Sequence, residues 1–105
     1  MNNRKLVLHG RLGAKVGKRD ALAANLMRAA AAMEGLAACR LYVVSTSETD
    51  PDGVWVTEIW DSAEDHAASL KRPETQQLIA ETMPLIAALP DRADKLDLLG
   101  GKGPR

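Results

Sequence analysis

The chain has 105 residues, with 14 basic and 14 acidic side chains and no long block of like charge. This length predicts a single domain spanning residues 1–105. The balanced charge argues against nucleic acid or an anionic membrane as the main partner, because both require a basic face.

Neither a membrane span nor a secretion signal is expected. No apolar run approaches the roughly 20 residues needed to cross a bilayer. The segment after Met1 is mixed and contains His9 and Arg11, unlike the apolar core of a signal peptide. We therefore expect a cytoplasmic protein.

Cysteine and histidine are too few for a typical structural metal site. Cys39 is the single cysteine, so it cannot form an intramolecular disulfide, and it is interpreted as a small buried apolar residue. The two histidines show no metal-ligand spacing. We expect no bound metal.

The apolar composition is rich in alanine and poor in aromatic residues. Tyr42, Trp55 and Trp60 are the three aromatic residues, and phenylalanine is absent. Such a core either lets helices pack close to a sheet or leaves space for a small molecule. Both interpretations stay open at this point.

The first half of the chain predicts strand, helix and strand. Residues 5–13 alternate in polarity with a period of two, as a half-buried strand does. Residues 37–46 predict a second strand, which carries Tyr42. Between them, residues 18–34 predict a helix that ends at Gly35 and packs by one face, with these apolar residues at helical spacing: Leu22, Leu26, Ala29, Ala30 and Met33.

A hairpin is predicted in the middle of the chain. Residues 49–53 contain Pro51 and Gly53 among polar neighbours, which is typical of a turn. Residues 54–60 predict a third strand paired with the second.

Two helical segments and a last strand complete the predicted order. Ser62 and Asp65 resemble a capping box that begins a helix. Pro73 opens another helical segment, which ends or kinks at Pro84. With a last strand at 94–99, the order is β-α-β-β-α-β. This order predicts an α+β fold of the ferredoxin-like type, a four-stranded antiparallel sheet with helices on one face.

The third predicted strand is apolar on two faces. Trp55 and Ile59 share one face, whereas Val54, Val56 and Trp60 share the other. Helices on one side of the sheet cover one face only, and burying Trp55 and Ile59 stabilises by on the order of 1.5–3 kcal/mol each. The simplest cover is the same face of a second copy, so we expect a homodimer.

Several segments resemble the antibiotic biosynthesis monooxygenase (ABM) family, and the resemblance covers nearly the whole chain. They are Gly17-Lys18-Arg19-Asp20, Cys39-Arg40-Leu41-Tyr42-Val43-Val44, Thr57-Glu58-Ile59-Trp60-Asp61-Ser62, Pro84-Leu85-Ile86 and Gly100-Gly101-Lys102-Gly103. The resemblance implies a dimeric α+β barrel with two sheets back to back. It also implies a family in which some members oxidise phenols or quinols with molecular oxygen and no cofactor, whereas others degrade haem.

The sequence departs from the family pattern at informative positions. Many members place a histidine nine residues after the aromatic that closes the third strand, and this chain has Ser69 there, with His66 nearby. Haem-degrading members use an asparagine in the first strand, where this chain has His9-Gly10. They also use a tryptophan and a histidine in the second helical region, and neither occurs between Ala67 and Leu89. These departures argue against haem degradation.

Two histidines are candidate catalytic bases. His66 follows the third strand by one helical turn, and an unperturbed histidine titrates near pH 6.5. The alternative for His66 is a structural or surface role. His9 lies in the first strand on the same face as Arg11, and it faces either the barrel interior or a pocket.

Four further residues are candidate substrate contacts: Trp60, Tyr42, Glu58 and Arg11. Trp60 and Tyr42 are either core residues or donors that orient a substrate oxygen. A buried Glu58 requires a partner, for which Arg40 and Arg11 are available, so an ion pair and a substrate contact both stay open.

Two functions are consistent with these residues. The first is a cofactor-independent monooxygenase acting on a small aromatic, phenolic or quinol-type substrate. The second is a dimeric small-molecule-binding or accessory protein without catalysis, which the serine at position 69 favours.

Overall fold

The computed structural model describes residues 4–103, and at residues 88–92 it describes the backbone alone. The elements follow in the order β1 (Leu6–Ala14), α1 (Arg19–Met33), β2 (Cys39–Ser47), β3 (Asp50–Trp60), α2 (Ala63–Ser69), α3 (Pro73–Thr82), the short 3-10 helix η1 (Met83–Leu85) and β4 (Ile86–Asp97).

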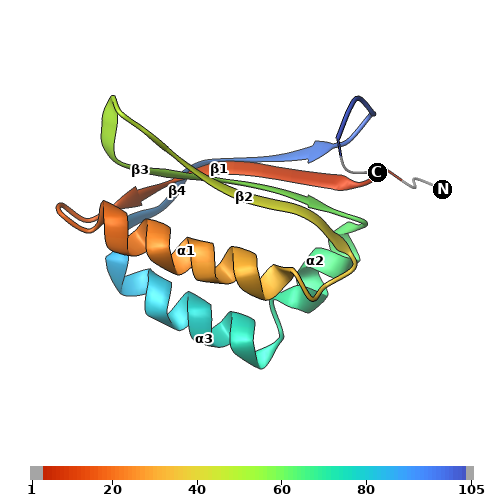
Figure 1. Ribbon diagram of the computed structural model, residues 1–105, viewed down its shortest axis with the longest axis horizontal. Helices are drawn as coiled ribbons and strands as arrows, with labels where there is room; N and C mark the ends of the chain where they lie inside the picture. The colour runs from red at the N-terminus through yellow and green to blue at the C-terminus, as the bar shows by residue number, and fades with distance from the viewer. Residues whose placement is uncertain (1–3, 104–105) are drawn as a thin grey trace.

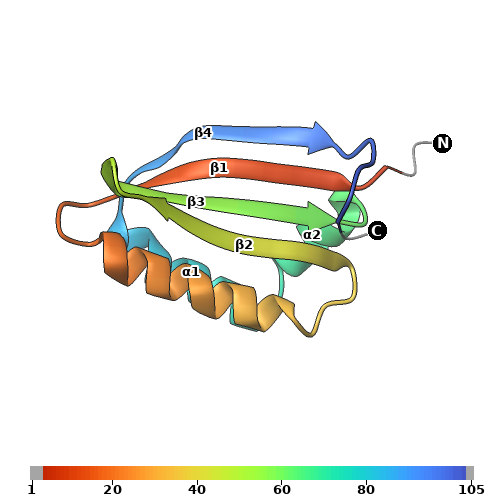
Figure 2. The ribbon, with the colours of Figure 1, turned by 45° about the horizontal axis from the view of Figure 1, so that its top comes forward.

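The described strands form one antiparallel four-stranded sheet in the order β2-β3-β1-β4. All three α-helices lie on the same side of this sheet, and no described element covers its other side (Figure 1). Figure 2 shows the four strands side by side with α1 beneath them. The predicted ferredoxin-like α+β fold is confirmed.

Two strands are longer than their sequence patterns predict. β3 begins at Asp50 rather than at residue 54, because the hairpin turn is tight and Ser47 pairs directly with Asp50. The pairing register shifts between Thr46 and Ser47, and this irregularity accommodates Pro51, which lacks a backbone N–H.

β4 begins at Ile86, not at residue 94. The polar residues and the proline in this stretch hide its strand pattern, but pairing with β1 extends from Leu6–Asp97 to Ala14–Ile86. The pairing register shifts between Arg11, which pairs with residue 92, and Gly13, which pairs with residue 88. The late start predicted for this strand was therefore wrong.

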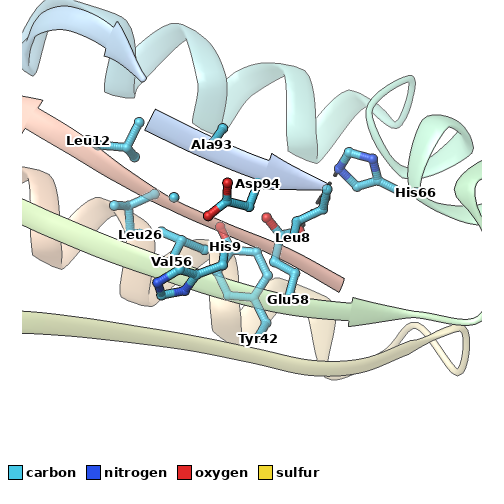
Figure 3. A pocket seen from close by; sticks show the side chains of 11 residues that line it. Leu8, His9, Leu12, Leu26, Tyr42, Val56, Glu58, His66, Ala93 and Asp94 are labelled. Atoms are coloured by element: carbon cyan, nitrogen blue, oxygen red, sulfur yellow. Dashed lines mark ion pairs between the residues drawn. The ribbon is translucent and has the colours of Figure 1, made fainter. Parts of the chain in front are cut away.

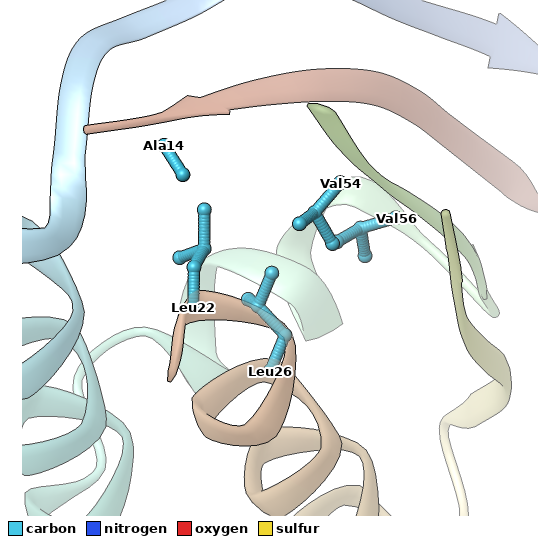
Figure 4. Packing of buried hydrophobic residues seen from close by; sticks show 5 residues of the cluster. All are labelled: Ala14, Leu22, Leu26, Val54 and Val56. Carbon is cyan, nitrogen blue, oxygen red and sulfur yellow. The ribbon is translucent and has the colours of Figure 1, made fainter. Parts of the chain in front are cut away.

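The apolar core lies between the sheet and α1. Leu22 and Leu26 of α1 pack against Ala14, Val54 and Val56 of the sheet (Figure 4). A second cluster joins Leu6, Met33 and Trp60 at the other end of α1. Each large apolar side chain buried in this way stabilises the fold by about 1.5–3 kcal/mol.

The alternation along β3 decides which side chains reach this core. Val54, Val56 and Trp60 are buried on the helix side, and Glu58 shares their face. Trp55 and Ile59 lie on the opposite, open face and are half-buried in the single chain. Two neighbours on that face are more exposed, Val43 at 42% and Leu96 at 49%.

In the part of the chain that the structure describes, no helix has the length and apolar character required to cross a membrane.

Candidate functional site

A cavity of about 370 Å³ lies between the helix-facing side of the sheet and all three α-helices. We call it the sheet–helix cavity. Its walls are mainly apolar, and its polar lining residues are Tyr42, Glu58, Trp60, His66, Ser69, Thr75 and Thr82. An adjoining pocket of about 240 Å³ shares five of its lining residues, and Figure 3 shows His66 at one end of that pocket, with Leu12 and Leu26 at the other.

Glu58 is the acidic group of the cavity. Its side chain is 17% exposed, and the indole Nε1–H of Trp60 donates a hydrogen bond of 2.9 Å to its Oε1 atom. His66 Nε2 lies 4.0 Å from the same oxygen, which is ion-pair range but longer than a hydrogen bond. Burial raises the pKa of the Glu58 carboxyl, although the Trp60 hydrogen bond and the charge of His66 act in the opposite direction.

Local sequence fixes the position of His66. The side-chain oxygen of Ser62 accepts a hydrogen bond of 3.0 Å from the Asp65 amide, and the Ser62 hydroxyl donates to the Asp65 carboxylate at 2.8 Å. The predicted start of α2 is thus confirmed, and it turns His66 back toward the end of β3. There the His66 ring meets the Trp60 ring edge-on, with centroids 5.4 Å apart.

Tyr42 of β2 is opposite Glu58 in the sheet, so both side chains point toward the helices. Burial raises the pKa of the Tyr42 phenol far above its usual value, and the nearby Glu58 charge adds to this effect. The phenol therefore keeps its proton at neutral pH and can donate a hydrogen bond to an oxygen atom in the cavity.

Ser69 is buried in the same wall of the cavity as His66. Ser69 follows His66 by three positions along α2, which places the two side chains on one face of the helix. The Ser69 hydroxyl donates to the His66 carbonyl at 2.6 Å. His66 therefore enters the cavity one helical turn before the position at which the resemblance leads us to expect a histidine.

His9 and Arg11 lie on the other face of the sheet. The His9 Nδ1 atom is 2.9 Å from the Thr57 hydroxyl, and His9 is one of the residues that line the smaller pocket, together with Glu58 and His66. Arg11 forms a two-pronged ion pair with Asp50 at 2.7 and 2.9 Å and stacks over the Trp55 ring at 5.8 Å. The strand register places His9 and Arg11 on the opposite face of the sheet from Glu58, and neither residue lines the sheet–helix cavity.

The expectation that an arginine pairs with Glu58 was wrong. Arg40 pairs with Asp61 at 2.8 Å near the protein surface. Arg11 points away from the helices because residues 58 and 11 occupy opposite faces of paired strands. Glu58 instead contacts Trp60, at the end of the same strand, and His66, in the first turn of α2.

The sequence pattern places Leu78, Ile79 and Met83 on one face of the helical segment after Pro73, but it did not identify that face as a wall of the cavity. Thr75, Leu78, Ile79 and Thr82 line the cavity from this helix. Their spacing of three and four residues places them on one helix face, but the spacing does not show which surface that face meets.

Among the described residues, no group of three or more His, Cys, Asp or Glu side chains is arranged to hold a metal ion. Burial raises the pKa of the Cys39 thiol, with a smaller contribution from Glu58, so the thiol form is favoured over the reactive thiolate.

The raised pKa of Glu58 predicts a pH-dependent effect of Glu58→Gln on stability. The native state holds this proton more tightly than the unfolded chain does, so ionisation destabilises the fold as the pH rises from the ordinary value of 4.5 to the raised one. The glutamine can still accept the Trp60 hydrogen bond. Above the raised pKa, the free energy of unfolding of the variant should exceed that of the wild type by about 1.4 kcal/mol for each unit by which the pKa is raised.

Urea unfolding at about pH 4 and about pH 8 measures this gain, which should be larger at the higher pH. An equal difference between the two proteins at both pH values, or a gain confined to acid, would contradict the assignment of Glu58 as a buried carboxyl destabilised by its charge.

Comparison with known proteins places this chain in a family. The antibiotic biosynthesis monooxygenase family model matches residues 6–81. A structure from Chloroflexus aurantiacus, described provisionally as an antibiotic biosynthesis monooxygenase, is 42% identical with a TM-score of 0.87 and covers 96% of this chain and 99% of its own.

Two more distant structures share the fold. One from Caulobacter crescentus with the same provisional description is 17% identical, has a TM-score of 0.84 and covers 93% of this chain and 92% of its own. A protein of unknown function from Nitrosomonas europaea is 25% identical, has a TM-score of 0.79 and covers 100% of this chain and 99% of its own. No protein of curated function matches the sequence. The family match over most of the chain, with the 42% identical relative, shows that this protein belongs to the antibiotic biosynthesis monooxygenase family.

Proposed function

We propose that the chain is a cofactor-independent monooxygenase that oxidises a small phenolic or quinol-type aromatic molecule with molecular oxygen. The observation that carries this proposal is the pairing of His66 with the buried Glu58 at the wall of a mainly apolar cavity. The family membership supports the same reaction class.

The first step is removal of a proton from the bound substrate. His66 lines the cavity and accepts the phenolic or benzylic proton as a general base. The Glu58 carboxylate 4.0 Å away then stabilises the histidine cation. The protonated Tyr42 phenol donates a hydrogen bond to the substrate oxygen on which negative charge develops.

The second step joins oxygen to the electron-rich carbon of the substrate anion. In an anthrone-type substrate, a ring CH₂ group becomes a carbonyl. One atom of O₂ enters the product, and the other leaves as water with the two hydrogens that the carbon loses. The substrate supplies all the electrons, so this reaction needs no external reductant. The apolar walls protect the anion from water while it reacts.

The alternative function is binding without catalysis. The observation that favours it is Ser69, which occupies the position where many family members have a histidine. In that case the cavity retains a ligand, and the protein gains thermal stability from binding without forming a product.

Replacing the proposed base tests the first function. The variant His66→Gln keeps a polar side chain but cannot accept and hold a proton, so oxygen uptake with anthrone should fall by roughly 10²–10⁴-fold. An oxygen electrode measures this rate with a panel of anthrones and hydroquinones. Near-ultraviolet circular dichroism checks that the Trp60 environment is retained.

The comparison variant is His9→Gln, because His9 bonds Thr57 and lines the adjoining pocket but not the sheet–helix cavity. This variant should keep wild-type turnover. A loss with His9→Gln and not with His66→Gln would assign the base to the other histidine. Absence of oxygen uptake above the buffer rate across the panel, combined with ligand-dependent thermal stabilisation, would favour the binding function.

We also propose that the open face of the sheet pairs with the same face of a second copy. Trp55 and Ile59 lie near the middle of this face, and Val43 and Leu96 extend the apolar surface on both sides. An apolar sheet face of this kind is stabilised when it is removed from water. A twofold arrangement would pair equivalent strands across the interface.

A charge placed in that face should separate the two copies. Ile59→Lys should weaken dimerisation by at least about a hundredfold, because an interface would have to bury an unpaired ammonium group. Met27→Lys is the matched control, since Met27 is 56% exposed on α1, away from the sheet. Sedimentation velocity at micromolar concentration measures the change. A wild-type protein that sediments as a monomer contradicts the proposed pairing.

A further inference from the structure

Three aliphatic hydroxyl groups line the sheet–helix cavity in the described part of the chain: those of Ser69, Thr75 and Thr82. Two of them bond the carbonyl of their own helix, which is the usual solution for a hydroxyl on a buried helix face. Ser69 donates to the His66 carbonyl at 2.6 Å, and Thr82 donates to the Leu78 carbonyl at 2.7 Å. These two hydroxyls are therefore satisfied without a ligand.

Thr75 is different. It is 7% exposed, and its Oγ1 atom is buried with no hydrogen-bond partner among the described residues. An unpaired buried hydroxyl lowers stability relative to a methyl group of the same size. A valine would fill this position on α3 without that cost. The hydroxyl at position 75 therefore calls for a partner that the protein does not itself supply.

The surroundings of Thr75 indicate the chemistry of such a partner. Leu70, Leu78 and Ile79 line the cavity beside it, and no described basic side chain lines this cavity apart from His66. A neutral hydroxyl in apolar surroundings selects an uncharged oxygen, because burying a charged group there is costly. A hydroxyl or carbonyl oxygen on an aromatic ring meets this requirement. The Thr75 Oγ1 atom is closed to water in the unliganded protein, so a ligand oxygen would be met by rotation about the Cα–Cβ bond, for which threonine has two rotamers in a helix.

We propose that Thr75 is a specificity-determining residue that binds a second oxygen substituent of the substrate, while His66 and Glu58 act on the first. This inference rests on the proposed function, since it takes the cavity as the aromatic-binding site. It narrows the substrate class to aromatic molecules that carry two oxygen groups, at least one of them able to lose a proton. A singly oxygenated aromatic should bind without using Thr75.

The test compares ligands that differ by one hydroxyl. The probes are alpha-naphthol and the isomeric dihydroxynaphthalenes that add one hydroxyl to it. Binding is measured by isothermal titration calorimetry under argon, so that turnover does not contribute. The proteins are the wild type, Thr75→Val, which removes the hydroxyl at nearly constant volume, and Thr75→Ser, which keeps it.

At least one dihydroxynaphthalene should bind the wild type about tenfold more tightly than alpha-naphthol. Thr75→Val should abolish that gain and leave alpha-naphthol binding unchanged, whereas Thr75→Ser should retain the gain. Without a ligand, Thr75→Val should melt about 4–8 °C higher than the wild type, because it removes an unsatisfied hydroxyl.

Three results would overturn the inference. Thr75→Val could keep the gain, it could weaken both ligands by the same factor, or no dihydroxynaphthalene could bind more tightly than alpha-naphthol. Each of these results is still compatible with the cavity as an aromatic-binding site. Failure of the wild type to bind any of the naphthalenes is a separate outcome, and it would overturn the proposed function together with the role of Thr75.

Discussion

The Glu58 carboxyl lies on a sheet face that three helices cover, and this burial shapes the chemistry around it. A carboxylate in apolar surroundings is costly unless neighbouring groups compensate it. Trp60 donates a hydrogen bond to it, and His66 provides a group that can become positive beside it. From Val54 to Trp60, the helix-facing side of β3 carries valine and tryptophan except at Glu58. The groups at this end of the cavity are arranged around that one acidic side chain.

The strand period explains how one short segment contributes to two surfaces. Successive side chains of β3 alternate between the helix side and the open side, so Glu58 and Trp60 enter the cavity while Trp55 and Ile59 do not. A shift of one residue in register would exchange these sets. The tight hairpin that pairs Ser47 with Asp50 holds the register, and the Arg11–Asp50 ion pair lies beside that hairpin. A Cβ atom at Gly53 would approach Asp50 Oδ2 to 2.7 Å, so a larger residue there would displace the Asp50 side chain from its present position.

Much of the fold could be predicted from periodicity and capping. The helical spacing of Leu22, Leu26 and Met33 predicted α1, and Ser62 with Asp65 predicted the start of α2. The start of β4 at Ile86 could not be predicted, because tertiary pairing with β1 overrides a segment whose own pattern is irregular.

The candidate site was predicted less completely than the fold. His66, Tyr42, Glu58 and Trp60 were named from the sequence, and they do line one cavity. Strand alternation places His9 and Arg11 on the opposite face of the sheet, although His9 also lines the adjoining pocket. The sequence alone does not show which of the two faces the helices cover. The contribution of α3 depends on how that helix crosses the sheet, so Thr75 could not be placed from spacing alone.

The proposed oxidation requires the cavity to convert a bound phenol into its anion. An anaerobic absorbance titration of bound alpha-naphthol measures this directly, because the naphtholate has its own absorption band. If His66 and Glu58 act as proposed, that band appears at a lower pH for the bound ligand than for naphthol free in buffer. A bound naphthol that ionises at the same pH as the free ligand, or at a higher one, would contradict the mechanism.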